Sequence, residues 1–150
     1  MLYFSAVLIF TKINSMALLE EFLEVKDSSI PNSGKGLFTK IFIPKGTLIV
    51  EYKGRRTTWK EVEDDYKNGY IYFISSSKVI DAKSYKKALG RYANDAKGLS
   101  RIKSIGNNSV YEVDGDKVFI KAVKDIAAGS EILVDYGKDY WEITKKNFAD

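Results

Sequence analysis

Short runs of alternating apolar and polar residues follow one another along most of the chain, and turn residues separate the runs. Alternation over residues 22–28 and the β-branched composition of residues 47–52 predict two strands. Two pairs of later runs predict hairpins, one around a serine cluster and one turned by Asp114-Gly115. We expect these hairpins to pair residues 70–74 with 79–82, and residues 109–113 with 117–122. The pattern is typical of a mostly β protein built from many short strands.

One short helix is expected to interrupt this pattern. Thr58-Trp59-Lys60-Glu61 has the sequence of a capping box, which predicts a helix over residues 59–67 that ends at Asn68-Gly69. The carboxylates between Glu61 and Asp65 suit a solvated face near the helix N-terminus. The alternative is an acidic surface on which a basic substrate segment docks.

The stretch from Glu131 to Trp141 holds the first candidate for chemistry. A buried strand is predicted over residues 132–134, and it ends abruptly in Asp135-Tyr136-Gly137. A tyrosine at such a corner can direct its hydroxyl at a ligand. The alternative is that Tyr136 caps the core and the aromatic residues after it cover that core.

A second candidate is Gly34-Lys35-Gly36, which is followed directly by the apolar pair Leu37-Phe38. Because glycine lacks a Cβ atom, such a loop can bring its backbone close to a ligand. It is not a dinucleotide-binding fingerprint, because a third glycine and a following helix are absent. A plain turn is the alternative.

The composition excludes whole classes of mechanism. The 150 residues are enough for one domain with a real core, and they include neither cysteine nor histidine. Disulfides, thiolate zinc sites and histidine-based triads are therefore excluded, so any chemistry must use tyrosine, carboxylates, lysine or backbone groups. The absence of cysteine fits a reducing compartment. The net charge of +4 is spread along the chain without a basic stripe, so a nucleic-acid partner is not expected.

The first ten residues are almost wholly apolar. Lys12 interrupts this run too early for a membrane span, and a signal-peptide cleavage site is absent, so no membrane association is expected. We expect residues 1–15 to be an extension upstream of a functional start at Met16, and residues 16–150 to form the domain. An extra strand or a disordered tag are the alternatives for the extension.

Taken in order, five segments resemble the SET domain, the fold of most protein-lysine methyltransferases. The resemblance runs from about Val25 to Trp141. The matching segments, in chain order, are 34–38, where that family has its Gly-x-Gly loop for S-adenosylmethionine, 43–54, 79–82 with 91–95, 108–111, and 129–137. The resemblance implies a β-clip-like fold of several small sheets with one or two short helices. It also implies a knot-like crossing of Asn94-Asp95 with the segment that ends at Tyr136.

The chain departs from the family pattern at two places. The usual Asn-His pair is Asn94-Asp95 here, and the Cys-x-Pro that commonly follows is absent. If backbone groups hold the cofactor at this position, Asp95 is compatible with cofactor binding. If the family needs the imidazole itself, the affinity for the cofactor would be lower in this chain. The cysteine-rich zinc-binding flanks are also missing, as in compact viral and bacterial members. In those members a C-terminal aromatic residue replaces the flank, which assigns Trp141 to a position on or near the adenine.

The resemblance implies transfer of a methyl group from S-adenosylmethionine to a lysine side chain of a protein, without a metal. Tyr136 is the implied catalytic residue, with its hydroxyl beside the methyl group and the amine. Tyr111 and Tyr140 are the implied walls of the lysine channel, and aromatic walls suit a cationic or methylated amine. The implied cofactor-binding residues are Lys35, Gly36, Leu37, Asn94, Asp95, Tyr136 and Trp141. The number of methyl groups added would depend on whether Tyr70, Tyr72 or Phe73 reaches the channel.

A different class of function remains open, in which the fold is kept without catalysis and binds a peptide or nucleic acid. Asp95 in place of histidine favours this alternative. For the enzyme, the expected partner is a protein with an exposed lysine, including basic proteins, and a homodimer is left open. The expected location is the cytoplasm, as in bacterial members, or another intracellular compartment.

Overall fold

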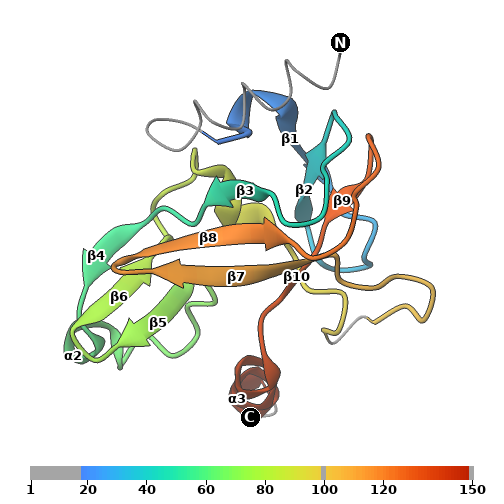
Figure 1. The fold of residues 1–150 in the computed structure, drawn as a ribbon. Coiled ribbons are helices and arrows are strands. Elements are labelled where there is room, and N and C mark those ends of the chain that lie inside the picture. Colours follow the sequence, from blue (N-terminus) through green and yellow to red (C-terminus); the bar gives the residue numbers. More distant parts are fainter. Residues whose placement is uncertain (1–17, 99–100, 149–150) are drawn as a thin grey trace.

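The structure of the chain, a computed structural model, describes residues 18–98 and 101–148. These residues form three small sheets and a few short helices, so the prediction of a mostly β fold is confirmed (Figure 1). The expected extension over residues 1–15 lies outside the described residues.

The first sheet has the strand order β1-β2-β9 and is antiparallel throughout. A 3-10 helix, η1 (Glu20–Phe22), leads directly into β1. The strands are β1 (Leu23–Asp27), β2 (Lys35–Thr39) and β9 (Glu131–Ile132). The glycine loop of the sequence therefore continues into a central strand, because β2 begins at Lys35.

The second sheet has the order β10-β7-β8-β3 and contains one of the two predicted hairpins. The strands are β3 (Leu48–Glu51), β7 (Ser109–Asp114), β8 (Lys117–Ala122) and β10 (Val134–Asp135). Gly115 turns the β7–β8 hairpin with a φ of +63°, which glycine adopts without strain. The short β10 runs parallel to β7, so the C-terminal part of the chain lies along the sheet edge.

The third sheet has the order β4-β6-β5 and contains the other predicted hairpin. Its strands are β4 (Arg55–Thr57), β5 (Ile71–Ser75) and β6 (Lys78–Asp81). β5 is an edge strand of this sheet.

The helix predicted over residues 59–67 is much shorter than expected, because α2 comprises only Trp59–Val62. Thr58 makes no side-chain capping bond. The carboxylate of Glu61 instead accepts a hydrogen bond from the Thr57 hydroxyl at 2.5 Å and is therefore not free for a capping box. The acidic residues 63–65 would also lie near the C-terminal end of a continuing helix, where the helix dipole disfavours negative charge.

The strand predicted over residues 132–134 is divided between two sheets at Leu133. The Leu133 carbonyl accepts hydrogen bonds from the backbone N–H groups of Asn108 and Ser109 at 2.9 and 3.0 Å. On the other side, the Val134 N–H donates to the Asn94 carbonyl at 2.8 Å. The chain before Tyr136 thus lies between Asn94 and the start of β7, and this brings the distant motifs together.

A C-terminal helix, α3 (Lys138–Phe148), was not predicted by the sequence pattern. Its eleven residues contain neither glycine nor proline, and it has Asp139 in its first turn and Lys145 and Lys146 in its last, which suits the helix dipole. It lies apart from the sheets, and Figure 1 shows it end-on. A further 3-10 helix, η2 (Leu89–Tyr92), leads into the Asn94-Asp95 motif.

The main core lies between the first and second sheets. Its fully buried side chains, each 0 % exposed, are Leu37, Ile43, Ile49, Ile120, Ile132 and Val134. Each such side chain stabilises the fold by roughly 1.5–3 kcal/mol relative to an exposed position. This core fixes the strand ends from which the candidate site residues project.

Candidate active site

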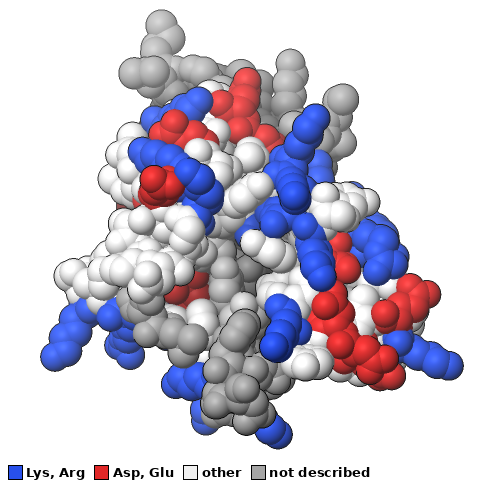
Figure 2. All heavy atoms as spheres, turned by 180° about the vertical axis from the view of Figure 1, so that it is seen from behind, with Lys and Arg blue, Asp and Glu red and all other residues white. Residues whose placement is uncertain are grey.

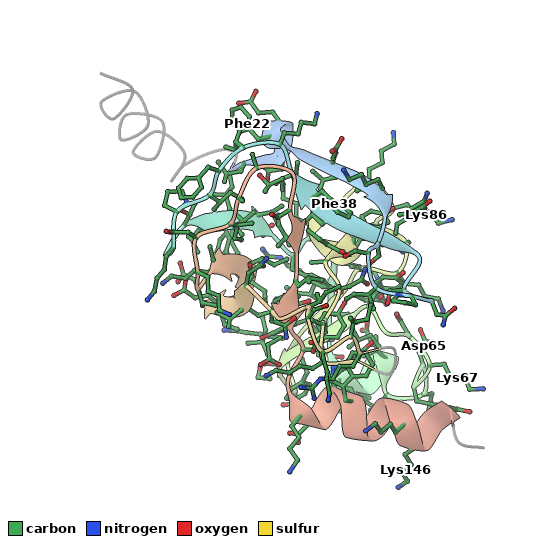
Figure 3. The ribbon with its side chains drawn as sticks, turned by 90° about the vertical axis from the view of Figure 1, so that its right-hand side faces the viewer. Phe22, Phe38, Asp65, Lys67, Lys86 and Lys146 are labelled. Atoms are coloured by element: carbon green, nitrogen blue, oxygen red, sulfur yellow. The ribbon has the colours of Figure 1, made fainter. Side chains whose placement is uncertain are left out.

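A cleft of about 1150 Å³ is lined by residues from six separate parts of the sequence. One border of the cleft is the segment from α2 to β5, and the other is the first turn of α3. The two borders approach each other at Gly69, where an added Cβ would lie 3.0 Å from the Tyr140 hydroxyl. Figure 3 shows Asp65 and Lys67 on the segment between α2 and β5, on the same side of the molecule as α3. The predicted site residues that line the cleft are Lys35, Asn94, Asp95, Tyr111, Tyr136, Tyr140 and Trp141.

Asp135 fixes the corner that follows β10. Its Oδ1 accepts a hydrogen bond from the Gly137 N–H at 2.9 Å, and its Oδ2 lies 3.2 Å from Lys97 Nζ. The hydrogen bond from Gly137, together with the nearby Lys97, holds the pKa of Asp135 below its ordinary value. Gly137 has a φ of +89°, where any side chain would be strained. This corner turns Tyr136 into the cleft.

The Tyr136 hydroxyl has a defined orientation. It donates a hydrogen bond to the Ala93 carbonyl at 2.5 Å. Burial, with the neighbouring Tyr140 hydroxyl, raises the pKa of Tyr136 well above its ordinary value, so the phenol is neutral at physiological pH. Because a hydroxyl carries one proton and two acceptor lone pairs, its oxygen remains able to accept contacts.

Tyrosine rings form a continuous wall from Tyr136 toward the third sheet. The Tyr111 ring stacks on Tyr136 with 6.2 Å between centroids, and the Tyr140 ring meets Tyr136 edge-on at 4.8 Å. Tyr72 reaches this wall and lies 5.0 Å from Tyr111. Phe73, in contrast, is 53 % exposed and packs edge-on against Trp59.

Tyr52 belongs to the same wall, although the sequence did not mark it as a site residue. Its ring lies 5.8 Å from Tyr111 and 6.1 Å from Tyr72, and its hydroxyl donates to the Tyr70 carbonyl at 2.8 Å. Burial raises the pKa of Tyr52 and of Tyr111, so both hydroxyls keep their protons. The available signal was its place within residues 43–54, the segment that matches the family pattern.

The glycine loop is held from behind by a buried carboxylate. Glu131 accepts hydrogen bonds from the Ser28 hydroxyl at 2.6 Å, from the Ser29 N–H at 3.0 Å, and from the Ser29 hydroxyl. A Cβ on Gly36 would lie 2.3 Å from Glu131 Oε1 and 3.3 Å from Ser28 Cα, so any larger residue there would have to displace the carboxylate or the strand. Glu131 was not predicted as a site residue, because its partners are more than 100 residues away.

Lys35 and Asn94 are in contact at the cleft, whereas Gly36 and Leu37 lie behind its surface. Asn94 Nδ2 donates to the Lys35 carbonyl at 2.9 Å and lies 3.5 Å from Glu131 Oε1. The Leu37 side chain is completely buried in the core, so only its backbone could contribute to a ligand site.

Trp141 lies in the cleft against the catalytic candidate. Its ring stacks on Tyr136 with 5.8 Å between centroids and an interplanar angle of 17°, and its Nε1–H donates to Asp95 Oδ2 at 2.7 Å. The indole also packs on Gly98, where a Cβ would lie 2.6 Å from Trp141 Cη2. The structure thus joins Asp95, Tyr136 and Trp141 in one cluster.

Arg91, which also lines the cleft, is anchored by backbone carbonyls. Its Nη1 donates to the carbonyls of Ala82 and Lys83 at 3.0 and 2.8 Å, and its guanidinium lies 4.0 Å above the Tyr70 ring. Tyr92 packs against the main core, and its hydroxyl donates to the Lys86 carbonyl at 2.5 Å.

Within residues 18–98 and 101–148, no cluster of three or more acidic, cysteine or histidine residues could hold a metal ion. No helix among the described residues is long and apolar enough to cross a membrane.

Similarity to known proteins extends over most of the chain. The family model described as the SET domain matches residues 34–137. The histone-lysine N-methyltransferase set-17 of Caenorhabditis elegans is 32% identical over 130 residues, which cover 84% of this chain and 44% of the relative. The histone-lysine N-methyltransferase set-1 of the same organism is 31% identical over 140 residues, which cover 85% of this chain and 55% of the relative. The histone-lysine N-methyltransferase EZH2 of Chaetomium thermophilum is 29% identical over 133 residues, 79% of this chain and 8% of the relative. The chain thus spans about half the length of the first two relatives.

Proposed function

Because the chain belongs to the SET domain family, we propose that it transfers a methyl group from S-adenosylmethionine to the side-chain amine of a lysine in a protein. The observation that carries this proposal is the Tyr136 hydroxyl, which is fixed by Ala93 inside a cleft with a wall of tyrosine rings. The histone-lysine methyltransferases named above support the reaction class.

The residues around the cleft fit the proposed methyl donor. Its volume of about 1150 Å³ exceeds the usual size of a single-ligand pocket, about 300–1000 Å³, and leaves room for a cofactor and a lysine side chain. Lys35, Asn94 and the backbone at Asp95 would hold the cofactor on the Trp141 side. The bound cofactor supplies an electrophilic methyl group, and the protein has to orient and desolvate the reactants.

The tyrosine wall would prepare the lysine amine for attack. A lysine has an ordinary pKa of about 10.4, and removal from water between Tyr72, Tyr111 and Tyr140 favours its neutral form. The same rings stabilise a cationic or methylated product by cation–π attraction of roughly 0.5–2 kcal/mol. Tyr136 would not act as a base, because burial keeps its hydroxyl protonated.

Tyr136 would instead orient the reacting groups. Its proton is committed to the Ala93 carbonyl, so its oxygen can accept contacts from the amine and from a polarised methyl group. A preorganised acceptor of this kind favours the transition state without reorganisation during the reaction.

We further propose that the substrate segment around the lysine is basic. Acidic side chains gather on the side of the molecule that carries α2, as Figure 2 shows in the view from behind. Of these, Glu63 and Asp65 line the cleft, and Asp139 lies on its opposite border. Complementary charge of this kind mainly accelerates encounter with the substrate.

The test is transfer of a labelled methyl group from S-adenosylmethionine to a mixture of basic proteins, with calorimetry of cofactor binding on the same preparation. We expect the labelled methyl group to be transferred and S-adenosylmethionine to bind. Peptide or nucleic-acid binding without cofactor binding would instead identify a non-enzymatic module. Absence of both transfer and cofactor binding would overturn the proposal.

A further inference from the structure

We propose that Asp95 is a positioning residue, whose carboxylate holds the Trp141 side chain and the Tyr136 backbone together and thereby sets how α3 closes the cleft. The inference deepens the proposed methyl transfer and rests on it for its effect on catalysis. It gives the acidic residue at this position a role of its own, in place of the histidine that the family pattern has there.

One oxygen of Asp95 faces the catalytic corner and the helix. Oδ2 accepts the Tyr136 backbone N–H at 2.9 Å and the Trp141 Nε1–H at 2.7 Å. These two donors are five residues apart and lie on opposite sides of the Gly137 corner. Asp95 is only 4 % exposed, so this contact is shielded from water.

The other oxygen faces the loop that follows Asp95. Oδ1 accepts the Lys97 backbone N–H and Asn107 Nδ2, both at 2.8 Å. Asn107 is itself held, because its Oδ1 accepts the Ala96 N–H at 2.8 Å. The carboxylate therefore ties three separate pieces of chain to one point.

Four donors around one side chain require a group that only accepts. An ionised carboxylate offers about four acceptor sites, whereas a neutral imidazole offers one. An amide offers a single oxygen, and its NH₂ group would face two donors whichever way it is turned. The surroundings thus explain an aspartate at position 95 and explain why its near-isosteric amide should not replace it.

Trp141 contacts residues on both halves of the cleft, so its position affects both. Its ring is held between the Asp95 bond, the face of Tyr136 and the backbone of Gly98. The preceding residue, Tyr140, contacts both Tyr136 and Trp141, at 4.8 and 5.0 Å between ring centroids. A displaced Trp141 would therefore move the lysine-channel wall together with the cofactor side.

The experiment uses the fluorescence of Trp141. The chain contains two tryptophans, so Trp59→Phe leaves Trp141 as the only one, and this variant is the reference for every measurement. In that background Asp95→Asn is expected to increase quenching of Trp141 by acrylamide and to lower kcat at least about tenfold. Asn107→Ala is the matched control, because it removes a donor to the same carboxylate on the side away from Trp141. It should lower the melting temperature without changing the Trp141 signal.

A second pair of variants tests the bond from its other end. Trp141→Phe keeps an aromatic ring but removes the donor, and it should lower kcat more than it changes KM. Combined with Trp141→Phe, Asp95→Asn should lower kcat by a smaller factor than it does alone, because the contact is already lost. If Asp95→Asn by itself fails to fold, the kcat of Trp141→Phe still tests the contact, because that variant keeps Asp95 in place.

The outcomes separate this inference from the proposed function. Unchanged Trp141 quenching in Asp95→Asn, with a loss of stability like that of Asn107→Ala, overturns the positioning role. Full kcat in Trp141→Phe overturns it as well. If the reference protein transfers no methyl group and binds no cofactor, the proposed function fails, while the quenching data still decide whether Asp95 positions Trp141.

Discussion

The hydroxyl of Tyr136 donates to the backbone carbonyl of Ala93, 43 residues earlier in the sequence, at an oxygen–oxygen distance of 2.5 Å. Ala93 directly precedes the Asn94-Asp95 motif, so this bond joins the catalytic candidate to the proposed cofactor side of the cleft. It also fixes the direction of the hydroxyl before any ligand arrives.

We predict that Tyr136→Phe lowers methyl transfer by about ten- to a thousandfold, or roughly 1.4–4 kcal/mol of barrier, while cofactor affinity stays nearly unchanged. The ring and its stacking on Tyr111 and Trp141 are kept, and only the oriented oxygen is lost. Single-turnover rates, melting temperature and calorimetry on one preparation would measure the three effects. Full activity in this variant would contradict the assignment, and Tyr111 would become the next candidate.

Tyr92→Phe is the matched control for that substitution. The Tyr92 hydroxyl also donates to a backbone carbonyl at 2.5 Å, that of Lys86. Loss of either hydrogen bond should reduce the free energy of unfolding by about 1 kcal/mol. Only the Tyr136 variant should lose transfer rate beyond this common effect.

Gly36→Ala is expected to weaken cofactor binding and to lower the free energy of unfolding by about 1–3 kcal/mol. The added Cβ would lie 2.3 Å from Glu131 Oε1 and 3.3 Å from Ser28 Cα, so β2 or the buried carboxylate must move. Urea unfolding and calorimetric titration with S-adenosylmethionine would measure both effects. Gly106→Ala provides the comparison, because a Cβ there meets no atom within 4 Å. Equal effects of the two substitutions would show that Glu131 does not support the loop.

The stability of the fold should fall when the pH rises above about 10. Burial raises the pKa of Tyr52, Tyr111 and Tyr136, whereas these groups ionise near pH 10 in the unfolded chain. Above that pH the folded state holds protons that the unfolded state has released, so rising pH favours unfolding. Below it these groups contribute no pH dependence.

Urea unfolding at a series of pH values from about 8 to 11 would test this prediction. Tyr111→Phe removes one of the three groups and should therefore reduce the slope of stability against pH. An unchanged slope in that variant would mean that Tyr111 has the same pKa in the folded and the unfolded protein. The ultraviolet absorbance of tyrosinate gives an independent measure of the same titration.

Glu63→Lys should reduce the apparent affinity for a basic substrate by about three- to tenfold at low salt, and the difference should shrink as salt is added. Asp64→Lys makes the same change of charge on the neighbouring residue, which does not line the cleft. It should therefore have the smaller effect. If both reversals leave the affinity unchanged at low salt, the acidic segment is only a solvated surface.

Local signals in the sequence predicted the parts of the fold that local contacts determine. The β7–β8 hairpin depends on Asp114-Gly115 and on alternation next to it, and the structure pairs those strands as expected. The segments that carry the family resemblance likewise contain several of the residues that line the cleft, including Tyr111 and Tyr136.

Specific side-chain contacts, both local and between distant residues, explain much of what the sequence pattern did not predict. The capping-box pattern predicted too long a helix, because Glu61 interacts with Thr57 and Arg55. The four donors of Asp95 come from positions 97, 107, 136 and 141, and no periodicity connects them. Helix α3 was not predicted, because the aromatic residues of its first turn were assigned to the site or to a cover of the core and not to a helix.

Leu133 joins β9 of the first sheet to β10 of the second, and it is the only residue between them. Because a single residue connects the two strands, neither sheet can separate at this edge without displacing the other. We expect the backbone amides of Leu133 and Val134 to exchange with solvent in a single opening event, together with that of Ser109. A compound that binds only in the lysine channel would then slow exchange at the glycine loop as well. The two halves of the cleft would unfold and be protected as one cooperative unit.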